Sequence, residues 1–270
     1  MSTAFLKTHR RFAPLRIEEG PDQQDRRLQK VKGIVFDLDG TLWGRDERNG
    51  FKSRRLVSLV ISLPQSYMFK QMRSALGISK NIDILDHCES LLASEREQAF
   101  QKIREIEAEA MIAQVPQPGL LPLIQYLEKR EIPKAICTRN FEVPVTHLLQ
   151  KFLPNSNFAP IVTRNFKPPK PDPAGILHIA ETWGLVTKNK SDHVIADASG
   201  MIMVGDSLDD MTAGYRAGAA TVLLVNDTNN HLKSHEHCDL AIERLNELID
   251  ILENGFSSKN EGDIIYHETR

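Results

Sequence analysis

The sequence has few cysteines and no long apolar run, and each shortage argues against a class of protein. Its three cysteines are odd in number and widely spaced, and no CxxC pair occurs. This pattern favours a reducing compartment and argues against a disulfide framework. No apolar run approaches the ~18–20 residues that a transmembrane helix needs. An internal repeat and a low-complexity tract are lacking too.

An excess of charge of one sign is also lacking. The formal net charge is −2 over 270 residues, and 41% of the residues are hydrophobic. This composition gives no reason to expect a nucleic acid or a membrane surface as a partner. The length suffices for one sizeable domain, or for a domain with a smaller one. We expect a monomer or a weak homodimer.

The first 30 residues are polar and predict a disordered N-terminal tail. Four basic residues, Lys7, Arg10, Arg11 and Arg16, precede the first acid, Glu18. A basic start is also a feature of mitochondrial transit peptides, although Ser and Thr are few here. We expect a cytoplasmic protein, with a mitochondrial one as the alternative.

Short apolar runs alternate with helical patterns along most of the chain. Continuous apolar runs are typical of parallel strands that are covered on both faces. Such runs predict strands at 31–37, 134–138, 159–163, 201–206 and 221–225. Helices are predicted at 119–131, 173–184, 209–218 and 240–252, with a polar exposed loop at 187–199. The alternation indicates a three-layer α/β domain with a parallel sheet.

Residues 44–116 interrupt this alternation, because they contain helix signals and few strand signals. The stretch 92–114 is strongly helical, and the PQPG that follows stops it. We therefore predict a helical subdomain inserted between the first two core strands. The predicted divisions are a tail at 1–30, an α/β core at 31–43 and 117–254, a cap at 44–116 and a tail at 255–270.

The most informative residues stand where the predicted strands end. The first strand runs into Asp37 and Asp39, which Gly-Thr follows. Ligands of open parallel sheets bind at the carboxyl ends of the strands, and two repelling carboxylates there need a cation or a reaction. The later strand ends supply Thr138, Arg139 and Asn140, then Lys170, and finally Asp206, Asp209 and Asp210.

Four motifs in this order resemble those of the haloacid dehalogenase superfamily: DLDGT, a strand-ending Thr, a Lys before Pro-x-Pro, and GDSLDD. The match covers roughly 31–43 and 119–250, and it is closest to the phosphoglycolate phosphatase-like branch. The resemblance implies a three-layer Rossmann-like fold with a parallel sheet. It also implies a small all-helical cap inserted after the first strand.

One departure from the family pattern lies before the cap. In fungal members of this branch a run similar to 63–78 follows the first motif almost at once, whereas here residues 43–62 intervene. This stretch has two interpretations, a real loop or a retained piece of non-coding sequence. In the run itself, four residues at helical spacing either form the cap core or face the substrate: Tyr67, Met68, Phe69 and Met72.

The resemblance implies a chemical role for each acid. Asp37 would attack a phosphoryl phosphorus and form an aspartyl-phosphate, and Asp39 would protonate the leaving oxygen and then activate water. Because the acids would repel an anionic phosphomonoester, Mg²⁺ is implied, a hard cation that takes oxygen ligands. Its implied ligands are the Asp37 carboxylate, the Asp39 backbone carbonyl and Asp206. Asp210 is a further ligand or a neighbour of the ligands.

The remaining motif residues are implied as contacts of the substrate phosphate. Lys170 would steady Asp37 and the transferred oxygens, Thr138 would bind a phosphate oxygen, and the turn at Gly40 would let backbone amides approach. Lys167 also precedes a proline, but only Lys170 begins Lys-Pro-x-Pro.

Some of these residues have plainer interpretations. Thr138 is also a common type of residue at a strand end. Arg139 and Asn140 either touch the same phosphate or shape their loop. Asp209 is interpreted as a helix N-terminal charge, because an acid in the first turn stabilises a helix.

Together the motifs predict a Mg²⁺-dependent phosphomonoester hydrolase acting on a small phosphorylated metabolite. A phosphomutase of sugar phosphates keeps all four motifs and stays an alternative. A carbon–halogen hydrolase is disfavoured, because such relatives generally lack the second aspartate and the Gly-Thr after it. A non-catalytic phosphate-binding protein of the receiver-domain kind is disfavoured too, since its acid pair comes first and its acceptor lies on the third strand.

Overall fold

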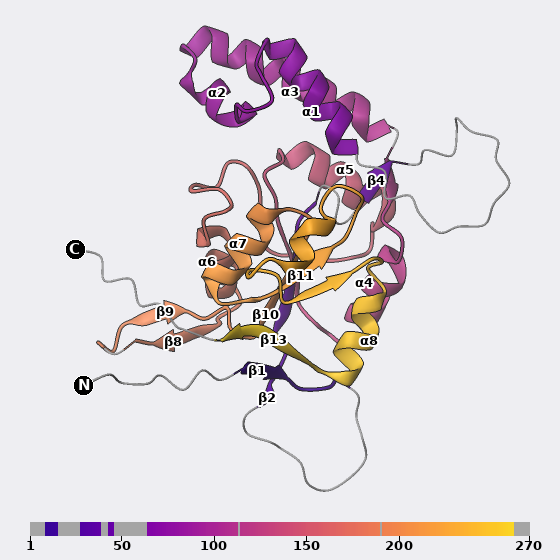
Figure 1. Ribbon diagram of the computed structural model, residues 1–270, viewed down its shortest axis with the longest axis vertical. Coiled ribbons are helices and arrows are strands. Elements are labelled where there is room, and N and C mark those ends of the chain that lie inside the picture. The colour runs from indigo at the N-terminus through magenta and orange to yellow at the C-terminus, as the bar shows by residue number, and fades with distance from the viewer. Residues whose placement is uncertain are drawn as a thin grey trace, which may run out of the picture.

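The computed structural model describes residues 9–15, 28–38, 43–45, 64–112, 114–189 and 191–261. Its central sheet is built from β3 (Gly33–Phe36), β6 (Lys134–Cys137), β7 (Ile161–Val162), β10 (Met201–Gly205), β11 (Ala220–Leu224) and β12 (Leu240–Ile242). The six strands are all parallel, in the order β12-β11-β10-β3-β6-β7 (Figure 1). The predicted α/β class with a parallel sheet is confirmed.

Helices cover both faces of this sheet. Their bounds are α4 (Leu120–Lys129), α5 (Glu142–Phe152), α6 (Ala174–Thr182), α7 (Leu208–Ala217) and α8 (Glu247–Asn254). Buried side chains of α4, α5 and α8 share one core cluster, and those of α6 and α7 share a second. Within the described ranges, no helix combines the length and the apolar character that crossing a bilayer requires.

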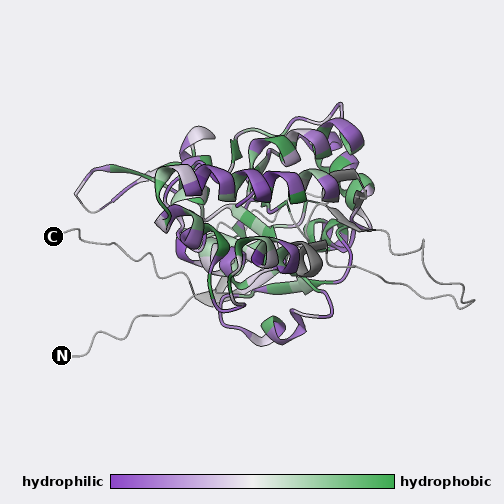
Figure 2. Cartoon of the chain, turned by 90° about the horizontal axis from the view of Figure 1, so that it is seen from above, coloured by the Kyte–Doolittle hydropathy of each residue, from purple (hydrophilic) through white to green (hydrophobic). Residues whose placement is uncertain are grey.

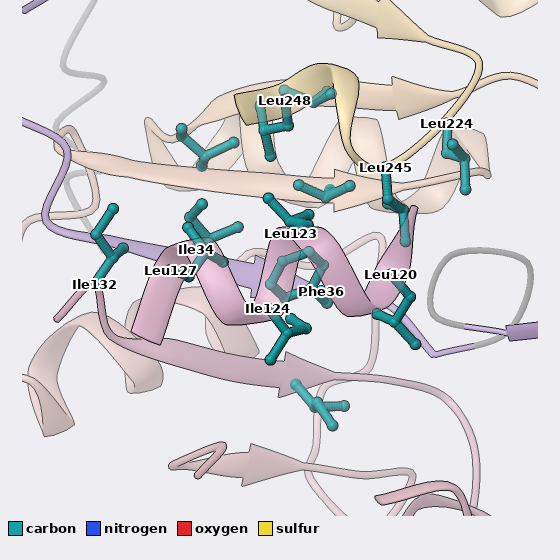
Figure 3. Close-up of a cluster of buried hydrophobic side chains, with 14 of the residues drawn as sticks. Ile34, Phe36, Leu120, Leu123, Ile124, Leu127, Ile132, Leu224, Leu245 and Leu248 are labelled. Carbon is teal, nitrogen blue, oxygen red and sulfur yellow. The ribbon is translucent and has the colours of Figure 1, made fainter. Parts of the chain in front are cut away.

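The larger core cluster follows from residue spacing on β3 and α4. Ile34 and Phe36 alternate with Val35 along β3, so they point to the α4 side while Val35 points to the other. On α4 the buried leucines and isoleucine lie at helical spacing and face the sheet (Figure 3). These residues are Leu120, Leu123, Ile124 and Leu127.

A group of three helices stands above the carboxyl ends of the strands (Figure 1). It comprises α1 (Pro64–Leu76), α2 (Ile84–Ser90) and α3 (Ala93–Ile112). Where the chain leaves and rejoins the core, β4 (Trp43–Arg45) pairs antiparallel with β5 (Gln114–Pro116). Of the intervening stretch 43–62, only 43–45 are among the described residues, so both interpretations of it stay open.

The helical group, called the cap below, has a small hydrophobic core of its own. Met72, Ile84, Cys88, Ala99 and Ile103 are its buried members. Seen from above, hydrophilic and hydrophobic turns alternate along the helices nearest the viewer (Figure 2), as expected of helices with one covered face. The cap is therefore built as a separate helical layer over the edge of the sheet.

Two predicted elements differ from the structure. The stretch 240–252, predicted as one helix, begins with β12, which pairs with β11, and becomes helical only at Glu247. Three residues are too few to display a strand period beside a longer helical one. The predicted loop at 187–199 contains a two-stranded antiparallel hairpin, β8 (Val186–Lys188) with β9 (Val194–Ala196).

The predicted tails also contain ordered strands. β1 (His9–Phe12), β2 (Leu28–Gln29) and β13 (Phe256–Glu261) form a three-stranded sheet. Phe12 is 2% exposed and stacks on Phe256 with ring centroids 4.4 Å apart. A lone aromatic within a polar segment gives little periodic signal, which explains why the sequence suggests disorder at 1–30 and 255–270.

Candidate active site

The ends of β3, β6 and β10 meet beneath the cap. β3 is the first strand of the central sheet in chain order, and the strand order proceeds from it in both directions. Such a switch point leaves a crevice outside the carboxyl ends, where ligands of α/β sheets bind. A cavity of about 300 Å³ lies there. Its cap side is lined by Phe69, Met72, Arg73, Asp83, Ile84 and Leu85.

Three carboxylates converge on the core side of the cavity. Asp37 follows β3, Asp206 follows β10, and Asp210 lies in the first turn of α7. One oxygen from each lies within 4.8 Å of the others, and all three residues are buried. Carboxylate oxygens held this closely repel one another, so the trio is suited to hold a divalent cation.

Lys170 is the cation that the chain itself places among these acids. Its Nζ donates to Asp37 Oδ1 at 2.6 Å and to Asp210 Oδ1 at 2.5 Å. Burial alone would lower the pKa of Lys170, but the charges of Asp210 and Asp37 outweigh it and hold that pKa above its ordinary value. Lys170 is therefore charged at any physiological pH. The rival Lys167 pairs with Glu89 at 3.7 Å, with its side chain 58% exposed.

The local sequence around Asp210 fixes its position. Ser207 caps α7: its Oγ accepts from the Asp210 backbone N–H, and Asp210 Oδ2 accepts from the Ser207 N–H in return. This reciprocal pair is a capping box. A side chain on Gly205 would overlap the Asp210 carboxylate. Glycine at the end of β10 thus leaves the space in which the acid stands.

Two asparagines that the sequence analysis missed hold Asp206. Asn226 Nδ2 donates to Asp206 Oδ2 at 3.2 Å, and Asn229 Nδ2 donates to the Asp206 carbonyl at 2.7 Å. Asn229 Oδ1 also accepts from the Asn226 backbone N–H at 2.7 Å. Both residues follow β11, the next strand of the sheet. Their position after the predicted strand at 221–225 is the sequence signal that could have identified them.

The residues after β6 occupy the neighbouring part of the wall. Thr138 and Asn140 are buried, and Thr138 Oγ1 accepts from the Asn140 backbone N–H at 3.1 Å. A hydroxyl that accepts one hydrogen bond can still donate another, and Thr138 lines the cavity. Asp39 and Gly40, predicted beside this group, lie outside the described residues.

Comparison with known proteins places the chain in a family. The sequence pattern of the haloacid dehalogenase-like hydrolase family matches residues 31–218. The chain belongs to this family. A Saccharomyces cerevisiae protein named as an uncharacterized hydrolase is 40% identical over 233 residues, which cover 84% of this chain and 93% of that protein. The resemblance seen in the motifs, including that to fungal members, is confirmed.

A further relative and a solved structure are also similar to the chain. An Arabidopsis thaliana haloacid dehalogenase-like hydrolase domain-containing protein is 29% identical over 233 residues, covering 84% of this chain and 86% of that protein. The solved structure of a Haemophilus somnus protein, described as a predicted phosphoglycolate phosphatase, has a TM-score of 0.58 at 20% identity. That likeness covers 82% of this chain and 97% of the other, and at such identity it shows the fold alone.

In this haloacid dehalogenase-like hydrolase, Arg139 joins the cap to the core. Its Nη2 donates to Asp83 Oδ2 in the cap and its Nη1 to Asp209 Oδ2 on α7, both at 2.8 Å. Burial lowers the pKa of Arg139, but the hydrogen bond and charge of Asp83 outweigh it and hold that pKa above its ordinary value. Two bound carboxylates favour the interpretation that Arg139 shapes the site. Asp209 does lie in the first turn of α7, and it also anchors this arginine.

Cys137 is a buried cysteine at the end of β6, directly before Thr138. Burial raises the pKa of its thiol to about 11, with the Lys170 charge opposing that rise. A thiol with this pKa is protonated at neutral pH, and only the thiolate is a strong nucleophile. Cys137 therefore belongs to the core, as the sequence suggests.

Proposed function

We propose that the chain is a Mg²⁺-dependent phosphomonoester hydrolase that acts on a small phosphorylated metabolite through an aspartyl-phosphate on Asp37. The main support is the approach of Asp37, Asp206 and Asp210 to within 4.8 Å, with Lys170 between two of them. Burying like charges is costly, so a protein that retains such a cluster is expected to use it. A site of this charge needs a cation to accept an anionic substrate.

The donor set fits Mg²⁺. This ion binds through one or two carboxylates together with substrate phosphate oxygens and retains several waters. The Asp37 carboxylate, the Asp39 backbone carbonyl and Asp206 would hold it, with Asp210 as a further ligand or a neighbour of the ligands. Asn226 would keep the Asp206 carboxylate in place. When bound, the ion supplies positive charge that offsets the acids and the phosphoryl oxygens.

The side chains of the chain then divide the work. An Asp37 oxygen attacks the phosphorus and forms the acyl-phosphate bond, while the bond to the leaving oxygen breaks and Asp39 supplies its proton. Lys170 Nζ donates to Oδ1 of Asp37 and would hold this carboxylate in position for the attack. Thr138 donates to a phosphoryl oxygen. In the second step Asp39 takes a proton from water, which attacks the phosphorus and frees Asp37.

Asp37→Asn tests this assignment, because the amide keeps the size of the side chain and loses its nucleophilic oxygen. Phosphate release from p-nitrophenyl phosphate should fall by ~10³-fold or more. Asp250→Asn is the matched control, since Asp250 lies exposed on α8 at a distance from the cavity. Added EDTA should abolish the wild-type rate and added Mg²⁺ should restore it. An Asp37→Asn rate above a few per cent of wild type would remove Asp37 from its proposed role.

A further inference from the structure

Arg73 of α1 is a cavity-lining cation that no carboxylate neutralises within the part of the chain that the structure describes. The lining also contains Lys170 and Arg139, and each of these binds two carboxylates. A fourth cation, Arg164, lies over the Phe141 ring at 3.7 Å and donates through Nε to the Arg139 carbonyl. The fold therefore gives these three cations partners.

Arg73 differs in that its guanidinium makes neither an ion pair nor a hydrogen bond with the described residues, although Arg164 Nη1 is also shielded from solvent. The Nε of Arg73 is shielded from solvent and has no hydrogen-bond acceptor among the described residues. The contact recorded for its guanidinium is the Phe69 ring, 5.9 Å away and one helical turn earlier on α1. Buried polar groups in native proteins are nearly always satisfied. Arg73 as a whole is only half-buried and lines the cavity, so the part of its side chain that is not shielded can contact a ligand there.

We propose that Arg73 binds a second anionic group of the substrate, so that the substrate is a small phosphomonoester that also bears a carboxylate or a second phosphate. This inference rests on the proposed function, in which the reacting phosphoryl group lies against the core acids. Arg73 faces the same cavity from the cap. A guanidinium matches the two oxygens of a carboxylate or a phosphate with parallel N–H bonds.

The size of the cavity limits the distance between the two anionic groups. Its volume of about 300 Å³ lies at the lower end of the ~300–1,000 Å³ typical of small-molecule sites. A cavity of this volume is suited to a small phosphomonoester. The second anion is therefore a few bonds away from the phosphoryl group.

A matched set of probes tests the inference. Phosphoglycolate carries a carboxylate, ethylene glycol bisphosphate a second phosphate, and ethyl phosphate neither, while the phosphoryl end stays the same. The kcat/KM of phosphate release is measured for wild type, Arg73→Gln and Arg73→Lys. Arg104→Gln is the control, because Arg104 is an exposed cap arginine paired with Glu97 and does not line the cavity.

Wild type should prefer at least one charged probe, and the favoured one identifies the second anion as carboxylate or phosphate. Arg73→Gln should lower kcat/KM for that probe ~10- to 100-fold, the usual effect of a lost hydrogen bond to a charged group. The value for ethyl phosphate should stay nearly unchanged. Arg73→Lys should recover part of the loss, and Arg104→Gln should behave as wild type.

Two other results would contradict the inference in different ways. Equal hydrolysis of charged and neutral probes by wild type, or an equal loss on all three in Arg73→Gln, would overturn the role of Arg73 and leave the proposed hydrolase intact. Hydrolysis of none of the probes, nor of p-nitrophenyl phosphate, would overturn the proposed function and this inference with it.

Discussion

Lys170→Met removes the cation between Asp37 and Asp210, and we expect it to lower the free energy of unfolding by ~3–5 kcal/mol at neutral pH. The magnitude follows from burial: the three side chains are 4%, 10% and 1% exposed, and both ion pairs are direct, at 2.6 and 2.5 Å. Methionine fills a similar volume. The loss therefore reflects carboxylates left without a cation rather than a cavity.

The loss should depend on pH in a defined direction. Without Lys170, repulsion between the clustered carboxylates is the source of the loss, and acid relieves such repulsion. The variant should therefore lose less stability at about pH 5 than at about pH 7.5. Lysine titration does not interfere. Because the folded-state pKa of Lys170 is raised, its stabilisation is fully present below the ordinary lysine pKa of about 10.4 and declines only as the pH rises beyond it.

Urea unfolding followed by circular dichroism in EDTA measures both effects. Lys188→Met serves as the matched control, because Lys188 pairs with Asp192 on an exposed hairpin with 63% and 80% of the two side chains exposed. Surface pairs of this kind contribute ~0–1 kcal/mol. A Lys170→Met loss no larger than that of the control, or a loss that is the same at both pH values, would refute the electrostatic reasoning.

Three further substitutions probe the geometry around the site. Gly205→Ala should cost ~1–3 kcal/mol through overpacking and displace Asp210, so both Tm and phosphate release should fall; unchanged values would contradict the tight fit. Arg139→Gln and Asp83→Asn should each raise KM by loosening the cap. Their double-mutant cycle should give a coupling of only ~0.5–1 kcal/mol, since both side chains are about one-third exposed. Additive effects would show that the ion pair does not couple cap to core.

The central sheet and much of the candidate site could be predicted because the information is local. Each of Asp37, Thr138 and Asp206 directly follows a continuous apolar run, and parallel strands bring such positions to one edge. The Lys-Pro-x-Pro motif indicates that Lys170 belongs to the site. The convergence of these groups needs only the direction of the strands and no knowledge of side-chain contacts.

The contacts that the sequence could not predict are the ones that join separate elements. The Arg139 pair with Asp83 depends on how the cap sits over the sheet, and nothing around residue 83 indicates it. That Arg73 has no carboxylate partner among the described residues depends on how α1 packs over the site, and the spacing on α1 predicts only an amphipathic helix. The stacking of Phe12 on Phe256 could not be predicted either, because the two residues lie far apart in the sequence and meet only where β1 pairs with β13.

The most direct measurement of the central claim is to trap the covalent intermediate. The wild-type chain is mixed with a phosphomonoester that it hydrolyses, and the reaction is quenched rapidly in acid. Reduction with borohydride then converts an acyl-phosphate on aspartate to homoserine. Peptide mass spectrometry should find homoserine at position 37 and nowhere else, and Asp37→Asn should give none. Homoserine at a different aspartate, or none at all while phosphate is released, would contradict the account.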